Sequence, residues 1–274
     1  MKPLILVTND DGIYSPGLHA AAEAVAPLGD LLIVAPRVQQ TAMSRALPKT
    51  PEIGVIEKVT LDITGTPHIA YGITGSPALS VAYALSELAP RKPDLCVSGV
   101  NYGENVGTSI GVSGTIGAAF EAAAQFIPGI AISLETDRSM HYADSYGEVG
   151  WEVAKHLTRL YAERVLNLGL PEQISLLNIN IPADATINTP ARITRQSKQS
   201  YYVFLEQPQR DFAKPYNLKF DVLIDKTTLE PDSDIQAFVY DRIVSITPLT
   251  IDLTAKIPLD EWYRTFMEKA NDTG

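Results

Sequence analysis

The chain has 274 residues, of which 45% are hydrophobic and 20% are charged, and its formal net charge is −10. This composition is typical of a folded globular protein, and the negative charge argues against binding to a nucleic-acid polymer or an acidic membrane surface. No run of about 18 uncharged apolar residues occurs, so the sequence predicts no membrane span. The apolar run 3–7 passes directly into polar residues without a small-residue cleavage site, which indicates a buried strand and not a signal peptide. The single cysteine, Cys96, cannot form an intrachain disulfide, and we expect a reducing, cytoplasmic location.

Apolar segments of strand length alternate with Ala- and Leu-rich segments of helix length over the first two thirds of the chain. This alternation predicts an α/β fold, in which a mostly parallel sheet carries helices on both faces. Pro16 and the pair Ser76-Pro77 mark the starts of two helices, because proline fits the first helical turn and serine caps it. The predicted strands cover 3–7, 31–35, 94–98, 129–134 and 175–181, and the predicted helices cover 16–28, 76–89, 115–126 and 146–166.

The pattern changes after Pro182, where the segments become more polar and more extended. The predicted elements here are a hairpin arm with strands over 200–206 and 218–225, a further strand over 242–247 and a terminal amphipathic helix over 259–270. A projecting hairpin has little core of its own and needs a partner subunit to pack against. We therefore divide the chain into a catalytic core over 1–190 and a C-terminal extension over 191–274 that is used in oligomerisation.

The sequence Thr-Asn-Asp-Asp-Gly over 8–12 stands at the end of the first predicted strand. On a regular strand two neighbouring carboxylates would point to opposite faces, and burying both would be costly. If the strand ends here and Gly12 turns the chain, Asp10 and Asp11 face one cleft, where they suit a hard cation such as Mg²⁺ or Mn²⁺. The alternative is a solvated turn that caps the next helix. Taken alone, a motif this short is more often such a turn than a metal site.

Two further polar segments follow strand ends. Loop 36–44 carries the hydroxyls of Thr41 and Ser44, either of which suits a metal, and the guanidinium of Arg37, which suits a phosphate. Segment 98–107 is rich in glycine and asparagine and leads to the helix start at 113–115, whose free N–H groups form a natural anion site. Each segment has a plain explanation as a loop or cap. Because parallel strands end at the same edge of a sheet, their coincidence predicts one shared site for a metal and an oxyanion.

The residues at these positions resemble the stationary-phase survival protein SurE family. The resemblance is carried, in chain order, by 5–13, 34–36, 75–77, 98–101, 113–119, 178–182 and 245–254. It implies a 5′- and 3′-nucleotidase with broad phosphomonoesterase activity and a three-layer α/β/α, Rossmann-like core. It also implies one Mg²⁺ or Mn²⁺ ion per subunit and a homodimer or homotetramer in which the C-terminal part is exchanged between subunits.

The resemblance also implies roles for individual residues. Thr41 departs from the family, which usually has serine there, and the loop 42–48 after it departs as well. The threonine keeps the hydroxyl and adds a methyl group. The metal ligands that the resemblance implies are Asp10, Asp11, Thr41 and Asn101. From the expected chemistry we assign Asp10 and Asp11 as catalytic residues, and Asn9, Asn105, Ser113, Gly114 and Thr115 as phosphate-binding residues.

The expected chemistry is metal-assisted transfer of a phosphoryl group to water. Either aspartate could instead act as base or nucleophile, but adjacent carboxylates favour direct attack by water, because chains that form an aspartyl-phosphate often carry Asp-x-Asp. Two alternatives remain: a nucleotide sensor that releases no phosphate, and a phosphatase that prefers polyphosphate or another phosphomonoester. Tyr102 suits either base stacking or packing, and His68, His141 and His156 lack metal-ligand spacing and are interpreted as structural or surface residues.

Overall fold

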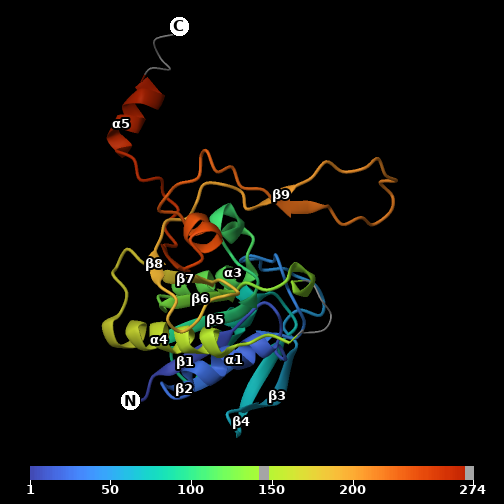
Figure 1. Cartoon of the computed structure of the whole chain (residues 1–274). Coiled ribbons are helices and arrows are strands. Elements are labelled where there is room, and N and C mark those ends of the chain that lie inside the picture. The colour runs from blue at the N-terminus through green and yellow to red at the C-terminus, as the bar shows by residue number, and fades with distance from the viewer. Residues whose placement is uncertain (142–147, 269–274) are drawn as a thin grey trace.

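The computed structural model of the chain describes residues 1–141 and 148–268 (Figure 1). Its main sheet is built of strands β1 (Leu4–Thr8), β2 (Asp30–Pro36), β3 (Ile56–Ile63), β4 (Thr66–Ile73), β5 (Leu95–Tyr102), β6 (Gly129–Leu134), β7 (Leu176–Ile181), β8 (Ala191–Ile193) and β11 (Val244–Leu249). Across the described residues these strands lie in the order β3-β4-β2-β1-β5-β6-β7-β11-β8. Neighbouring strands are parallel, apart from the antiparallel pairs β3–β4 and β7–β11.

Helices cover both faces of the sheet (Figure 1). The helices are α1 (Pro16–Val25), α2 (Pro77–Tyr83), α3 (Gly114–Ala124), α4 (Glu152–Leu168) and α5 (Leu259–Tyr263), with shorter helical turns over 84–88, 107–111, 138–140, 236–240 and 264–268. Side chains of β1 alternate between the faces: Ile5 and Val7 pack on the side of α1 and α4, whereas Leu4 and Leu6 pack on the side of α2 and α3. The predicted α/β fold is confirmed.

The starts of the helices follow the predicted chemistry. Ser15 precedes Pro16 and accepts a hydrogen bond from the backbone of Gly17, and Ser76 accepts one from Leu79 at 3.1 Å. These side chains satisfy N–H groups that a helix start leaves without a partner, while the prolines supply the required φ. Both predicted helix starts therefore hold.

The hairpin of β3 and β4 was not predicted, and the sequence assigned no element to residues 56–73. It lies at the edge of the sheet, where β3 alternates exposed residues such as Lys58 and Asp62 with more buried ones such as Leu61. The turn between the strands is Thr64-Gly65, and both residues have positive φ. A threonine-glycine turn between two alternating segments is a local signal that would have located this hairpin.

The C-terminal part contains the predicted hairpin in a shorter form. Strands β9 (Tyr202–Phe204) and β10 (Phe220–Val222) pair antiparallel and project from the body (Figure 1). Both β8 and β11 add to the main sheet, so residues of the predicted extension complete the sheet of the core. The division into 1–190 and 191–274 stays a prediction.

Two predicted helices reach beyond the described residues. Residues 146–147 of the helix expected over 146–166 lie outside them, and the observed α4 begins at Glu152. The last two residues of the helix expected over 259–270 also lie outside them. Helix α5 and the turn after it point away from the body (Figure 1). Within 1–141 and 148–268 no helix is long and apolar enough to cross a membrane.

Candidate active site

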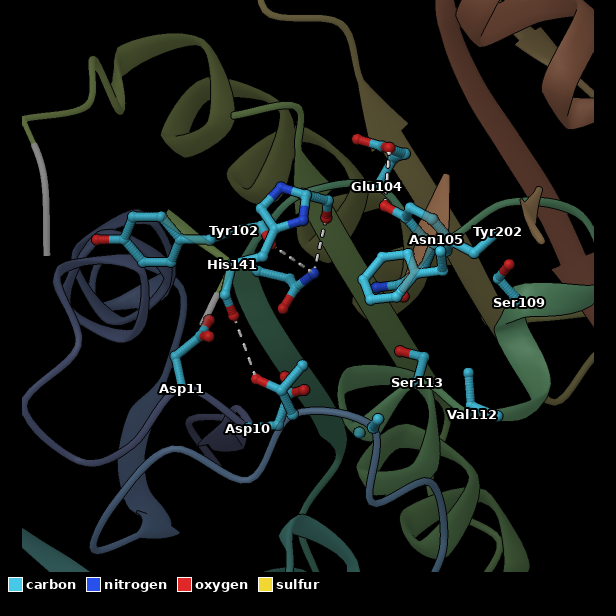
Figure 2. Close-up of a pocket in the computed structure, with 16 residues that line it drawn as sticks. Asp10, Asp11, Tyr102, Glu104, Asn105, Ser109, Val112, Ser113, His141 and Tyr202 are labelled. Atoms are coloured by element: carbon cyan, nitrogen blue, oxygen red, sulfur yellow. Dashed lines mark hydrogen bonds between the residues drawn. The ribbon is translucent and has the colours of Figure 1, made fainter. Parts of the chain in front are cut away.

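One pocket gathers side chains from separate parts of the chain (Figure 2). It lies where β1 and β5 end and α3 begins, at the carboxyl ends of the parallel strands, which is where open α/β sheets bind ligands. The predicted site residues that line it are Asp10, Asp11, Thr41, Asn101, Asn105, Ser113 and Gly114. The structure therefore brings together residues that the sequence spreads over more than a hundred positions.

The two aspartates face this pocket because the strand ends in a tight turn. Asn9 forms this turn, since its Nδ2 donates to the carbonyl of Gly12 at 3.3 Å and its Oδ1 accepts from the amide of Gly12 at 3.2 Å. Gly12 has φ of +107°, a conformation that side chains disfavour. Asp10 and Asp11 are only 3% and 2% exposed. Asn9 thus shapes the turn, and its contact with phosphate stays a prediction.

Burial changes the acidity of both aspartates. Burial raises the pKa of Asp10 to about 6, and a hydrogen bond from the hydroxyl of Thr115 opposes this rise. Burial and the neighbouring charge of Asp10 raise the pKa of Asp11 well above its usual value, against a hydrogen bond of 3.3 Å from Gln39. Two carboxylates held together in this way favour any cation that neutralises them.

The start of α3 forms a wall against Asp10. Ser113 caps the helix by accepting from the amide of Ile116 at 3.1 Å, and it also lines the pocket. A Cβ atom on Gly114 would lie 2.6 Å from Oδ2 of Asp10, so only glycine fits there. Thr115 is fully buried, and its hydroxyl donates to Oδ1 of Asp10 at 2.7 Å. Thr115 therefore contacts the aspartate, and its contact with phosphate stays a prediction.

Asn101, at the end of β5, presents one oxygen to the pocket. Its Nδ2 donates to the carbonyls of Tyr102 at 3.3 Å and Gly103 at 2.7 Å. Because the amide nitrogen is used in this way, Oδ1 is the atom of this side chain that suits a cation. Tyr102 packs edge to face on Trp151, with ring centroids 5.1 Å apart, which favours packing over base stacking for this tyrosine.

Asn105 is clamped by neighbouring strands. Its Nδ2 donates to Oγ of Ser133 at 3.0 Å, and its backbone amide donates to Oδ1 of Asn180 at 2.7 Å. Its carbonyl accepts from the amide groups of Asn178 and Asn180. No role was predicted for Ser133, Asn178 or Asn180, although two asparagines at alternating positions of a buried strand are a visible signal. They fix the loop after β5 at Asn105.

The loop after β2 reaches the same pocket. Nε2 of Gln39 donates a hydrogen bond of 3.3 Å to Oδ1 of Asp11 and one of 2.9 Å to the carbonyl of His141. The hydroxyl of Thr41 donates to the same carbonyl at 3.4 Å. His141 also lines the pocket, which its position in the sequence did not indicate. A residue that reaches a site through the fold alone leaves no spacing signal.

The hairpin contributes two aromatic residues, Tyr202 and Phe220, to the pocket. In the sequence, Tyr202 and Phe220 lie within the predicted strands 200–206 and 218–225 of the arm, and neither was predicted as a site residue. Their contribution depends on where the hairpin lies relative to the carboxyl ends of the strands, which local patterns do not determine. Figure 2 shows Tyr202 across the pocket from Asp10 and Asp11.

The charge of the pocket fits a divalent cation. Three carboxylates line it, those of Asp10, Asp11 and Glu104, and no lysine or arginine lines it in the part of the chain that the structure describes. A phosphate would be repelled here unless a cation supplied positive charge. No group of three or more His, Cys, Asp or Glu side chains among the described residues is arranged for a metal. Mg²⁺ is commonly held by one or two carboxylates and completed by neutral oxygens, waters and substrate phosphate, and this pocket offers that set.

Comparison with known proteins gives matches over nearly the whole chain. The family model of survival protein SurE matches residues 5–203, a range that includes every pocket residue except Phe220. The protein named 5′-nucleotidase SurE in Thermococcus gammatolerans is 39% identical over 270 residues, which is 98% of each chain. Its namesake in Thermococcus kodakarensis is 40% identical over 257 residues, covering 94% of this chain and 96% of that one. The crystal structure of the SurE protein from Aquifex aeolicus matches with a TM-score of 0.71 at 29% identity, covering 98% of this chain and 100% of that chain.

Proposed function

Because the chain belongs to the SurE family, we propose that it is a phosphoric monoester hydrolase that releases phosphate from nucleoside 5′-monophosphates. The name of the relatives supports this activity. The observation in the molecule that carries the proposal is the pairing of two buried carboxylates with the start of α3 in one pocket. The first group suits a cation and the second suits an oxyanion, and a phosphate monoester bound to a divalent ion needs both. We extend the proposal to 3′-monophosphates, as the family resemblance implies.

We propose that one Mg²⁺ or Mn²⁺ ion is held by Asp10, Asp11, the hydroxyl of Thr41 and Oδ1 of Asn101. The cation, when bound, supplies the positive charge that neutralises the phosphate and activates water. The hydroxyl of Thr115 favours the ionised form of Asp10 by donating to it, against the effect of burial. The amide of Gln39 acts in the same direction on Asp11.

The start of α3 holds the phosphate in this proposal. Its positive end and the backbone beside Ser113 and Gly114 stabilise the charge on the phosphoryl oxygens as water attacks phosphorus. Gly114 lets the phosphate and Asp10 approach the helix closely, because a larger residue would displace the carboxylate. Hydrogen bonds to Ser133 of β6 and Asn180 of β7 hold Asn105, and with it the loop after β5, in place beside the pocket.

We also propose that the protein is a homodimer or homotetramer. The C-terminal segment 250–268 exposes large apolar side chains, with Leu253 at 90%, Leu259 at 63%, Phe266 at 60% and Trp262 at 51%. A contiguous exposed apolar segment of this kind is typical of an interface. Sedimentation of the full chain at several concentrations tests this, and a monomer at all concentrations would contradict it.

The experiment that tests the function is phosphate release from a panel of substrates in the presence of Mg²⁺ and of Mn²⁺. The panel contains nucleoside 5′- and 3′-monophosphates, short-chain polyphosphate and simple phosphomonoesters. We expect the highest kcat/KM for a nucleoside monophosphate. Saturable nucleotide binding without phosphate release would instead identify a sensor, and a higher kcat/KM for polyphosphate would identify a different phosphatase.

A further inference from the structure

The pocket has two chemically different sides. Asp10, Asp11 and the start of α3 line one side with oxygen and N–H groups. Tyr202 of the hairpin lies across the pocket from these aspartates (Figure 2), and Phe220, whose ring contacts that of Tyr202, lines the pocket as well. A nucleoside monophosphate has the same polarity, with an anionic phosphate at one end and a flat aromatic base at the other. The two ends of such a molecule match the two sides of the pocket.

The pocket is too small to hold both the phosphate and the base of a nucleotide. The cavity has a volume of about 90 Å³ and is partly open to the surface. Pockets that enclose a whole drug-sized ligand have volumes of about 300 to 1,000 Å³. The cavity therefore has room for a phosphate group, while the rest of a nucleotide must lie in the mouth. Phe220 stands at that mouth, with 39% of its surface exposed.

The register of the hairpin places the aromatic rings together. Tyr202 pairs with Val222 and Phe204 pairs with Phe220, so these four side chains share one face of the two-stranded sheet. The rings of Tyr202 and Phe220 meet edge to face, with centroids 5.6 Å apart and an interplanar angle of 83°. An edge-to-face contact positions the ring of Phe220 and orients its plane.

Two contacts anchor this face of the hairpin to the core. The hydroxyl of Tyr202 donates to Oε1 of Glu104 at 3.0 Å, and Glu104 is only 7% exposed, in the loop after β5. Next to Phe220, Asp221 forms an ion pair of 2.6 Å with Arg138. The hairpin is thus joined to the loop after β5, which also carries Asn105, and to the helical turn over 138–140.

We propose that Phe220, positioned by Tyr202, stacks on the base of the bound nucleotide and makes the enzyme select phosphomonoesters whose leaving group carries a base. This inference rests on the proposed function. Stacking on an aromatic ring tolerates every base, because each has a π face. The proposal therefore predicts strong discrimination between nucleotides and base-free sugar phosphates, and weak discrimination among the bases.

The test compares two substrates that differ only in the base, adenosine 5′-monophosphate and ribose 5-phosphate, with Mn²⁺ present. We expect the unaltered protein to have a kcat/KM at least about tenfold higher for the nucleotide, as expected for one stacked base. In Phe220→Ala the ratio of the two kcat/KM values should fall about tenfold, mainly through KM. Phe220→Tyr keeps an aromatic face and should restore the ratio. Phe204→Ala is the matched control, since Phe204 pairs with Phe220 on the same face, is 68% exposed and lies outside the pocket.

The outcomes distinguish a failure of the stacking inference from a failure of the proposed function. A ratio that falls in Phe220→Ala, returns in Phe220→Tyr and stays unchanged in Phe204→Ala supports the stacking role. Equal losses on both substrates in Phe220→Ala, or an equal change in Phe204→Ala, would show a structural role for the hairpin and overturn the inference alone. No phosphate release from either substrate by the unaltered, folded protein would overturn the proposed function and the inference with it.

Discussion

The hydroxyl of Thr115 donates a hydrogen bond of 2.7 Å to Oδ1 of Asp10, and both residues are buried. This contact joins the first turn of α3 to the end of β1. The helix that we propose as the phosphate site is thus joined directly to the carboxylate that suits a cation. The hydrogen bond also opposes the rise in the pKa of Asp10 that burial causes.

Replacing Thr115 by valine removes this donor and keeps the shape of the side chain. A hydrogen bond to a charged group contributes about 1.5 to 3 kcal/mol, so we expect the dissociation constant for Mn²⁺ to rise at least about tenfold. Thr115→Ser retains the hydroxyl and is the control, with a change of less than about threefold. Calorimetric titration of the metal-free variants measures both. Equal affinities in the valine and serine variants would show that the hydroxyl is unimportant.

Replacing Gly114 by alanine pushes a methyl group against Asp10, since the added Cβ would lie 2.6 Å from Oδ2. We expect kcat/KM for a nucleoside monophosphate to fall at least tenfold, because overpacking of about 1 to 3 kcal/mol is relieved by moving the carboxylate. Gly111→Ala is the control, since a Cβ there meets nothing within 4 Å. Comparable kinetics in the two variants would count against the close approach of α3 to Asp10.

Thr41 tests the predicted metal ligand that departs from the family. We expect Thr41→Ser to leave metal affinity within about twofold, and Thr41→Ala to weaken it about tenfold, the scale of one lost polar contact. Activity measured over a range of Mn²⁺ concentrations separates affinity from turnover. If serine and alanine give the same metal dependence, the hydroxyl does not bind the metal.

The stability of the metal-free protein should depend on the protonation of Asp10. Its pKa is 3.8 as an ordinary side chain and about 6 in the fold, so the folded state binds the proton more tightly. Folding stability is then lost as pH rises from about 4 to about 6, by on the order of 3 kcal/mol. Asp10→Asn lacks this loss, so its stability relative to the unaltered protein should increase over that pH range. Urea unfolding of both proteins at pH 4.5 and 7, without metal, measures the difference.

Two results would bear on that expectation. Saturating Mn²⁺ at pH 7 should restore stability to the unaltered protein and have little effect on Asp10→Asn, because the cation neutralises the same buried charge. A stability difference between the two proteins that does not change with pH would contradict the raised pKa of Asp10.

The sequence predicted the central part of the fold because its signals are local. Buried strands such as 129–134 are continuous apolar runs, and Ser76-Pro77 marks a helix start by chemistry that acts within one turn. The hairpin of β3 and β4 was missed because β3 carries charged residues such as Glu57 on an open edge, which weakens its apolar pattern. Its turn at Thr64-Gly65 was the remaining signal.

The residues of the pocket also fall into those that local sequence patterns identified and those that they missed. Asp10, Asp11 and Gly114 lie at strand and helix ends, which the topology of a parallel sheet brings together, so their segments identified them. His141, Tyr202 and Phe220 reach the pocket through a loop and a hairpin whose direction depends on tertiary contacts. No spacing in the sequence encodes that direction. Prediction from local pattern therefore found the side of the pocket that suits the metal and the phosphate, and missed the aromatic side.

The most direct test of the account is the metal dependence of phosphate release from a nucleoside 5′-monophosphate. Protein treated with EDTA and shown to be free of metal by elemental analysis should release no phosphate above background. Mn²⁺ or Mg²⁺ should restore the rate, with one ion bound per chain, and Asp10→Asn should not recover at the same metal concentration. Undiminished hydrolysis by the metal-free protein would contradict the account, because Asp10 and Asp11 would then have a role other than holding a cation.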